Sequence, residues 1–327
     1  MIGLIAGCLL SLQPITADGT EESVWFVGDR PPDAIGNEHE LCSRETTNGY
    51  WVIQPLMSRP EALVVGENNI WFVEDGSGVE LYKVKRAVRH TGTTSGSPSR
   101  HRAQLVSFLE SDQRPTDLVL IDEQPIIAFG GLNLDLYRYI GNKLIQLPTL
   151  EKPDAHVASL NGKLIAASPE ENEVSVWYLQ DGKWRGGDII ELEDQLVDFI
   201  VNDDWPLLIT KNEKNASIIG LQQSGPIGIA TFKVPRGRWG VVPSPDGLTV
   251  VGVERNGRTT VLDIGWPSGE VSEEIVLNEK FAGSDSVLTT VTLIIPLILF
   301  IVIVTLTRRH GQNQQNNTSN SKHIDDE

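Results

Sequence analysis

Short apolar runs alternate with polar turn residues through most of the chain. From about residue 22 to residue 280, runs rich in Val, Ile, Trp, Phe and Tyr are separated by turn dipeptides every 8–12 residues. This spacing is typical of short antiparallel strands joined by hairpins. Outside the C-terminal region, no helical period persists for more than about two turns. The pattern predicts strands over residues 24–27, 70–73, 118–121, 126–129, 174–179, 207–210 and 259–264.

The predicted strands form a repeat. Leu136, Val176, Ile218 and Val261 occupy matching places in successive units, at steps of 40, 42 and 43 residues. Leu81 lies 55 residues before Leu136, and a polar insertion at about 86–103 accounts for the excess. A period of 40–45 residues with four strands per unit is the signature of a propeller blade. We therefore predict an all-β, β-propeller-like domain of about five to six four-stranded blades, the N-terminal unit covering residues 22–57.

Several motifs carry a resemblance to known blades. The segment SPDGLTVV at 244–251, followed by VLDI at 261–264 and by Gly269, resembles WD40-like bacterial blades. The segment FGG at 129–131 resembles a Kelch blade, as does NGK at 161–163. The resemblance covers residues 115–280, and residues 22–110 share only the strand texture. It implies a propeller that recognises a partner through loops around a central channel, whereas an array of two β-sandwich domains is the alternative.

One long apolar segment stands apart from the strands. Residues 286–307 contain no charged residue over 22 positions, and Arg308 and Arg309 follow them directly. A helix of this length spans about 33 Å, enough for a hydrocarbon core of about 30 Å. A buried globular helix is the alternative, but residues 293–304 lack a polar stripe. We predict a transmembrane helix with the N-terminus outside and a short disordered cytoplasmic tail at 308–327, because positive flanks stay in the cytoplasm.

The N-terminus suggests export. Residues 2–12 are apolar, and Pro14 and the small residue Ala17 follow them, so residues 1–17 are interpreted as a signal peptide cleaved before Asp18. The sequence around Cys8 also resembles a lipobox, which would make Cys8 a lipidated N-terminus instead. Residues 18–281 then form the extracytoplasmic domain of a single-pass cell-membrane protein, periplasmic in a bacterial host or extracellular in a eukaryotic one.

Composition limits the partners and the bonds of this domain. After cleavage only Cys42 remains, so no internal disulfide can form. Residues 18–285 contain 24 Lys and Arg against 41 Asp and Glu, a net charge of −17. So acidic a domain suits an aqueous compartment and argues against nucleic acid as a partner.

The sequence shows no recognisable catalytic motif. His39, His90, His101 and His156 lack the spacing of a zinc site, and the chain has neither a G-x-S-x-G motif nor a phosphate-binding glycine loop. The acidic stretches at 191–194 and 203–204 lack the frame of a calcium loop. We therefore predict no catalytic, metal-binding or cofactor-binding residue and no cofactor. The recurring tryptophans are expected to pack between blades.

One basic segment interrupts the acidic chain. Residues 83–102 contain six cations and no acid, and the middle of the segment is rich in Thr, Ser, Gly and Pro. A flexible loop between two strands of one blade fits this composition. The loop is either simply solvated or a docking arm for anionic lipid headgroups or an acidic partner. The possible anionic-partner contacts are Lys83, Lys85, Arg86, Arg89, Arg100 and Arg102.

These features together favour a membrane-anchored extracytoplasmic binding or scaffold protein that holds a protein partner. The alternative is a propeller-type glycan-processing enzyme, a hydrolase or lyase, tethered to the membrane. Carboxylates and histidines converging at one mouth of the channel would favour the enzyme. A sensor that signals through the span is a third possibility, but the tail leaves little room for output.

Overall fold

A computed structural model describes residues 17–280 of the 327-residue chain, except 21–22, 30–38, 47–48, 57, 76–77, 86–102 and 255. The described residues form strands, turns and bends but no helix, so none of them provides a helix long and apolar enough to cross a membrane. The predicted transmembrane segment 286–307 and the tail 308–327 lie outside the described residues, as do all residues of the predicted signal peptide except Ala17.

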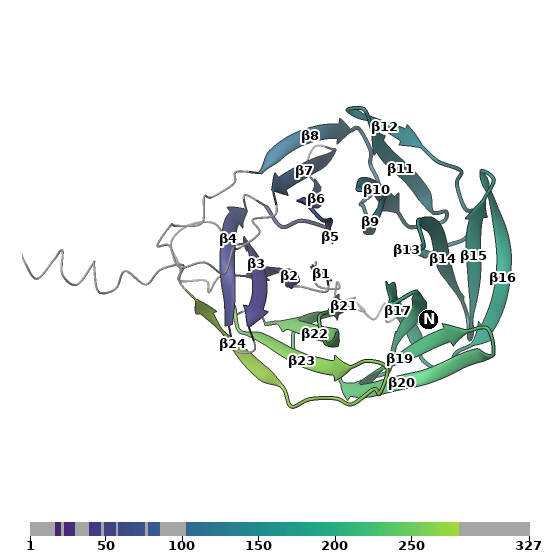
Figure 1. Ribbon diagram of the computed structural model, residues 1–327. Helices are drawn as coiled ribbons and strands as arrows, with labels where there is room; N and C mark the ends of the chain where they lie inside the picture. Colours follow the sequence, from purple (N-terminus) through teal and green to yellow (C-terminus); the bar gives the residue numbers. More distant parts are fainter. Residues whose placement is uncertain are drawn as a thin grey trace, which may run out of the picture. The chain divides into compact units, whose positions relative to one another are not determined.

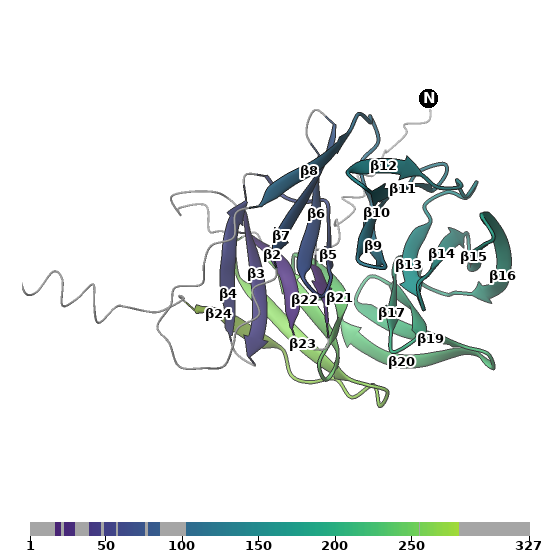
Figure 2. The ribbon, with the colours of Figure 1, turned by 45° about the horizontal axis from the view of Figure 1, so that its top comes forward.

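The described strands form six four-stranded antiparallel units arranged around a common axis (Figures 1 and 2). Blade 1 contains β1 (Ala17–Gly19), β2 (Val24–Asp29), β3 (His39–Thr46) and β4 (Gly49–Leu56). Blade 2 contains β5 (Ala62–Val65), β6 (Asn69–Asp75), β7 (Val79–Lys85) and β8 (Gln104–Leu109). Blade 3 contains β9 (Asp117–Ile121), β10 (Gln124–Phe129), β11 (Asp135–Ile140) and β12 (Lys143–Gln146).

The remaining three blades follow in sequence. Blade 4 contains β13 (His156–Leu160), β14 (Lys163–Glu170), β15 (Glu173–Gln180) and β16 (Lys183–Glu191). Blade 5 contains β17 (Gln195–Asn202), β18 (Trp205–Lys211), β19 (Asn215–Gln222) and β20 (Gly225–Lys233). Blade 6 contains β21 (Arg238–Ser244), β22 (Gly247–Val253), β23 (Thr259–Gly265) and β24 (Ile275–Lys280). The first strand of each blade is the innermost.

The predicted propeller and its repeat are confirmed. Leu81, Leu136, Val176, Ile218 and Val261 all lie on the third strand of successive blades, from β7 to β23. The expected N-terminal unit is a complete sixth blade. The strands on either side of the basic segment, β7 and β8, pair within blade 2, and residues 86–102 between them lie outside the described residues.

The core is divided among the interfaces between blades. Each of six buried apolar clusters joins two neighbouring blades of the ring, as strands with apolar residues on both faces require. The tryptophans pack against these clusters as expected: Trp25, Trp71 and Trp239 are buried, and Trp205 and Trp266 meet edge to face. Stability is therefore distributed around the ring, and each blade depends on its two neighbours.

Blades 1 and 6 come from opposite ends of the described chain, and strand pairing joins them. β24 pairs antiparallel with β23 through residues 275–277, then parallel with β4 through residues 278–280. The two blades thereby become one eight-stranded sheet. We call this junction, including the apolar cluster that contains Phe26, Cys42 and Val251, the seam.

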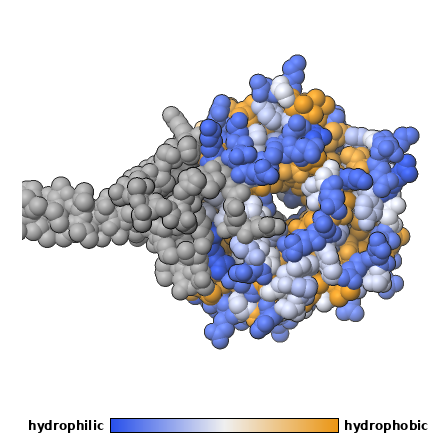
Figure 3. All heavy atoms as spheres, viewed as in Figure 1, coloured by the Kyte–Doolittle hydropathy of each residue, from blue (hydrophilic) through white to orange (hydrophobic). Residues whose placement is uncertain are grey.

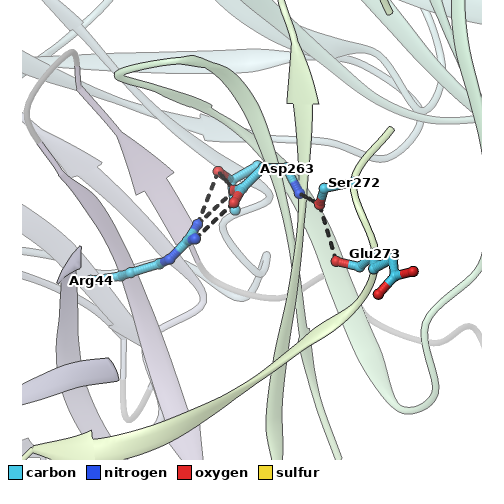
Figure 4. Close-up of polar contacts among 5 residues, drawn as sticks. Arg44, Asp263, Ser272 and Glu273 are labelled. Carbon is cyan, nitrogen blue, oxygen red and sulfur yellow. Dashed lines mark hydrogen bonds and ion pairs between the residues drawn. The ribbon is translucent and has the colours of Figure 1, made fainter. Parts of the chain in front are cut away.

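Among the described residues, two ion pairs cross the seam. The guanidinium of Arg44 on β3 donates to both carboxylate oxygens of Asp263 on β23, at 2.6 and 2.8 Å (Figure 4). Thr249 donates a further hydrogen bond to Asp263, and the backbone N–H of Asp263 donates to Ser272 Oγ. The second ion pair joins Arg238 on β21 to Asp29 on β2. The bidentate contact between Arg44 and Asp263 fixes the orientation of the two side chains as well as their distance.

The carboxyl group of Asp263 depends on its partners for its charge. Burial by itself raises the pKa of Asp263, but the hydrogen bonds from Arg44 and Thr249 and the charge of Arg44 outweigh burial, so the net pKa lies below the usual value. A carboxylate with a depressed folded pKa stabilises the folded state above its unfolded pKa. This contribution is lost as the pH falls through the folded pKa.

We expect Arg44→Met to lower the free energy of unfolding by about 2 kcal/mol at pH 7, because Asp263 would keep its partial burial and lose its charged partner. Urea unfolding of the full chain in detergent, followed by tryptophan fluorescence, measures this change. The difference from wild type should shrink below pH 3.8, the ordinary pKa of Asp263. Arg185→Met is the matched control, because it removes an arginine from an exposed ion pair. Arg185 Nη2 lies 3.8 Å from Asp181 Oδ2, and the two side chains are 61% and 91% exposed. Equal losses in both variants would contradict a special role for the seam.

Candidate functional site

A cavity of about 290 Å³ lies on the axis of the ring. The innermost strands of all six blades line it, and the ring is open at its centre in the space-filling view (Figure 3). Most lining residues are Val, Leu, Ala and Ile. The ionisable groups among them are Asp18, Glu61, Asp117, His156 and Asp198, so the described lining contains four carboxyl groups and no Lys or Arg.

Three of these groups converge from three consecutive blades. His156 Nδ1 lies 3.7 Å from Asp117 Oδ2 and 3.9 Å from Asp198 Oδ1. One potential ligand atom from each residue lies within 4.8 Å of the others. The three side chains keep 23–26% of their surface exposed and line the cavity. We call these three residues the axial cluster.

Equivalent positions on the inner strands place the axial cluster. Asp117 and His156 are the first residues of β9 and β13, and they pair with Ala128 and Ala167 on the second strands. Asp198 pairs in the same way with Ile209. The residue after each cluster member is apolar and buried against the preceding blade, so the alternation of the strand places the cluster member on the opposite face of its strand.

A β-bulge completes this placement in blade 5. Leu196 pairs with Thr210 and Asp198 with Ile209, so Val197 is an extra residue on β17. A bulge of this kind re-aims the side chains that follow it and often lies next to a functional site. The bulge gives Asp198 the orientation that Asp117 and His156 obtain without one.

Burial shifts all three groups of the axial cluster toward their neutral forms. Burial, and next the charge of Asp198, raises the pKa of Asp117 well above its usual value. Burial also raises the pKa of Asp198, although His156 and the N–H of Phe199 oppose the shift. Burial lowers the pKa of His156 against the attraction of Asp198 and Asp154. The cavity therefore disfavours charge unless a ligand compensates it.

Asp18 has a different environment in the same cavity. Its Oδ2 accepts a 2.6 Å hydrogen bond from the backbone N–H of Val65 in the next blade, and its Oδ1 accepts one from Gly19. Asp117 likewise accepts a bond from the N–H of Val157 in the next blade, at 3.4 Å. The inner edge of an innermost strand has no ladder partner, so these carboxyl groups satisfy donors that would otherwise be orphaned.

The structure describes two of the six predicted contact residues, Lys83 and Lys85, and neither lines the cavity. Lys83 lies on β7, with its Nζ 5.4 Å from the centre of the Trp71 ring, and Lys85 is the exposed last residue of that strand. Arg86, Arg89, Arg100 and Arg102 lie outside the described residues. Neither acidic stretch, at 191–194 or 203–204, belongs to a cluster of metal-ligating atoms in the described part of the chain.

Sequence motifs did not single out the axial cluster, and the prediction of no metal-binding residue stays a prediction. Motif searches look for ligands close together in sequence, whereas these residues are 39 and 42 residues apart. Those intervals lie within one residue of the 40 and 42 residues that separate Leu136, Val176 and Ile218. Polar residues separated by one blade period were the signal that could have revealed the cluster.

Solved structures share the fold of this chain. A lectin from Aleuria aurantia, in complex with alpha-methyl-L-fucoside, has a TM-score of 0.55 and 8% identity, over 81% of this chain and 96% of the lectin. A candidate 6-phosphogluconolactonase from Bacteroides uniformis has a TM-score of 0.50 and 12% identity, over 79% of this chain and 84% of that protein. At such identities the likeness extends to the fold alone. No protein-family model matches the sequence, and a comparison with curated proteins finds no match.

Asp18 generates a prediction about pH. Burial raises the pKa of Asp18 to about 7 from 3.8, although the N–H groups of Val65 and Gly19 oppose the shift. Protonated Asp18 therefore favours the folded state. As the pH rises from 3.8 to about 7, the free energy of unfolding falls by up to about 4 kcal/mol. Asp18→Asn removes the titration and keeps one of the two acceptor oxygens, because an NH₂ group replaces the other. Urea unfolding from pH 4 to pH 8 should therefore show a smaller loss of stability in this variant than in wild type.

The exposed variant Asp181→Asn is the control for this comparison. It removes the same charge from a turn residue with φ of 51°, a conformation that Asn tolerates, and should follow the wild-type pH curve. Parallel curves for wild type and Asp18→Asn would show that Asp18 does not titrate in this range.

Proposed function

We propose that this chain is a membrane-tethered extracytoplasmic binding protein that holds a protein partner at the axial cavity of its propeller. The observation that carries the proposal is the axial cavity itself, where all six blades contribute lining and three contribute the axial cluster. A concave, mainly apolar site with a few convergent polar groups is the usual form of a recognition site.

The size of the cavity defines the mode of recognition. A volume of about 290 Å³ admits one or two side chains rather than a folded domain. The partner therefore inserts a side chain or a peptide end, and the rims of the blades supply the surrounding contact. In this proposal the apolar walls provide affinity and the axial cluster provides specificity.

The tether is the second part of the proposal. The uncharged segment 286–307 supports a transmembrane span, and the two arginines after it support a cytoplasmic tail. The last described strand ends at Lys280, so only residues 281–285 separate the propeller from the proposed span. Such a short connection would hold the domain close to the membrane surface.

The tether predicts the behaviour of the chain in membrane fractions. We expect the full chain to remain in the membrane pellet after alkaline carbonate extraction, because about 22 uncharged residues are buried in lipid. A shortened chain that ends at residue 285 should still be exported, and it should be found in the soluble exported fraction rather than in the membrane pellet. Release of the full chain by carbonate would refute an integral anchor, whereas retention of the shortened chain would point to a second attachment, such as lipid on Cys8.

Recognition at the channel predicts the outcome of affinity capture from crosslinked native membranes. The full chain should recover a partner reproducibly, and Ser159→Trp should reduce the recovery at least tenfold by placing an indole in the cavity that Ser159 lines. Thr231→Trp, on the exposed outer strand β20, should recover the partner as wild type does. Mass spectrometry of the captured proteins provides the measurement.

Other outcomes of the capture bear on the proposal. Equal recovery by Ser159→Trp would exclude the cavity as the recognition site, and an empty capture by a folded chain would exclude a held protein partner. Loss of the partner on charge reversal at Arg86, Arg89, Arg100 and Arg102 would instead assign recognition to the basic segment. In that case the partner is acidic and its binding should weaken with salt.

A second candidate function has one specific observation in its favour. The axial cluster brings two carboxyl groups and an imidazole together in the channel, the arrangement expected for a propeller-type glycan-processing enzyme. Turnover of chromogenic glycosides that is abolished by His156→Gln would favour this hydrolase or lyase. Absence of turnover across such a set would count against it.

A further inference from the structure

The three side chains of the axial cluster lie close together but form no hydrogen bond with one another. His156 Nδ1 lies 3.7 and 3.9 Å from the two carboxylate oxygens, beyond the range of a hydrogen bond. Two donor atoms that each lie about 2.1 Å from one ion are about 3.4 Å apart in tetrahedral coordination. The two separations from His156 exceed that value by about 0.3 and 0.5 Å, and the two carboxylate oxygens lie within 4.8 Å of each other. An inward movement of the three side chains would bring these atoms to a common ion.

The surroundings of the axial cluster favour a cation. Two carboxyl groups face one histidine, and the described lining of the cavity contains no Lys or Arg that could neutralise them. A divalent ion bound there would balance both carboxylates in their charged forms. The alternative is a neutral cluster that leaves its polar atoms without hydrogen bonds to one another.

Backbone donors hold two of the ligand atoms in place. Asp198 Oδ1 accepts a 2.7 Å hydrogen bond from its neighbour Phe199, and Asp117 Oδ2 accepts one from Val157. Hydrogen bonds to ligand carboxylates orient metal ligands in proteins. The β-bulge at Val197 contributes to the same geometry, because it turns Asp198 toward the cluster.

We infer that Asp117, His156 and Asp198 bind one divalent first-row transition-metal ion, such as Zn²⁺ or Mn²⁺, in the axial cavity. An imidazole among the ligands suits these ions, whereas Ca²⁺ and Mg²⁺ prefer oxygen ligands alone. Three protein ligands leave at least one coordination position, which faces the cavity. The inference rests on the proposed function in one respect: the open position would accept an oxygen or nitrogen atom of the inserted partner group.

Isothermal titration calorimetry tests the inference on the purified full chain in detergent, after removal of metal with a chelator. We expect ZnCl₂ or MnCl₂ to bind at one ion per chain, and CaCl₂ and MgCl₂ to bind at least tenfold more weakly. Asp117→Asn, His156→Gln and Asp198→Asn should each weaken binding of the transition metal at least tenfold. Asp181→Asn, which removes a charge from an exposed turn, should bind as wild type does.

The variants and the probes keep the outcomes distinct. Binding that persists in all three cluster variants is surface binding and overturns the inference, as does the absence of binding by the wild-type chain. If one variant fails to fold by tryptophan fluorescence, the other two still decide the result, because each residue comes from a different blade. A second readout is the Mn²⁺ electron paramagnetic resonance signal, which should broaden with the wild-type chain and stay sharp with His156→Gln.

Metal binding and partner binding can be refuted independently of each other. Metal binding without a captured partner would leave the site intact and remove the proposed function. Capture of a partner that is insensitive to the chelator and to His156→Gln would retain the recognition role and remove the ion from it.

Discussion

Closure of the ring between the first and last blades is the constraint on which the rest of the structure depends. Five of the six interfaces join blades that are consecutive in sequence, so a short connection already brings their apolar faces together. The seam joins residues more than 200 positions apart, as the bonds from Arg44 to Asp263 and from Arg238 to Asp29 show. Apolar packing, strand pairing and two ion pairs all act there. An open ring would expose the apolar faces of blades 1 and 6. It would also eliminate the axial cavity, because every blade contributes to the walls of the cavity.

The same closure explains the chemistry at the axis. Inner strands converge there with backbone edges that no further strand can pair. Aspartates on the inner strands satisfy some of those donors, as Asp18 does for Val65 and Asp117 for Val157. In this propeller, carboxyl groups therefore lie at the centre for structural reasons. Asp117 satisfies such a donor and also lies beside His156, so in the inferred site it would serve as a ligand as well.

The sequence predicted the fold better than it predicted the site. Strand runs such as 118–121 and the third-strand repeat from Leu136 to Val261 depend on local alternation and on a fixed period, and both are visible along the chain. The predicted N-terminal unit began at residue 22 and so left out β1, which has three residues and carries little pattern. The axial cluster depends on three residues meeting across blades and on a bulge at Val197, which no local pattern encodes. The seam was also missed, since the pairing of β24 with β4 joins distant segments and has no turn between them to mark it.

The seam also sets an order of events during synthesis. Blade 1 is made first, and its outer strand β4 has an unpaired edge until β24, the last strand of the propeller, has been made. Until then an edge of hydrogen-bonding groups and the apolar face around Phe26 are open to other chains, a known route to misassembly. Blade 1, which is synthesised first, therefore contacts its second neighbour only after blade 6 has been made. Termination of translation before residue 275 would release a chain that lacks β24, and its ring could not close. A pause in translation before that point would prolong the exposure of blade 1.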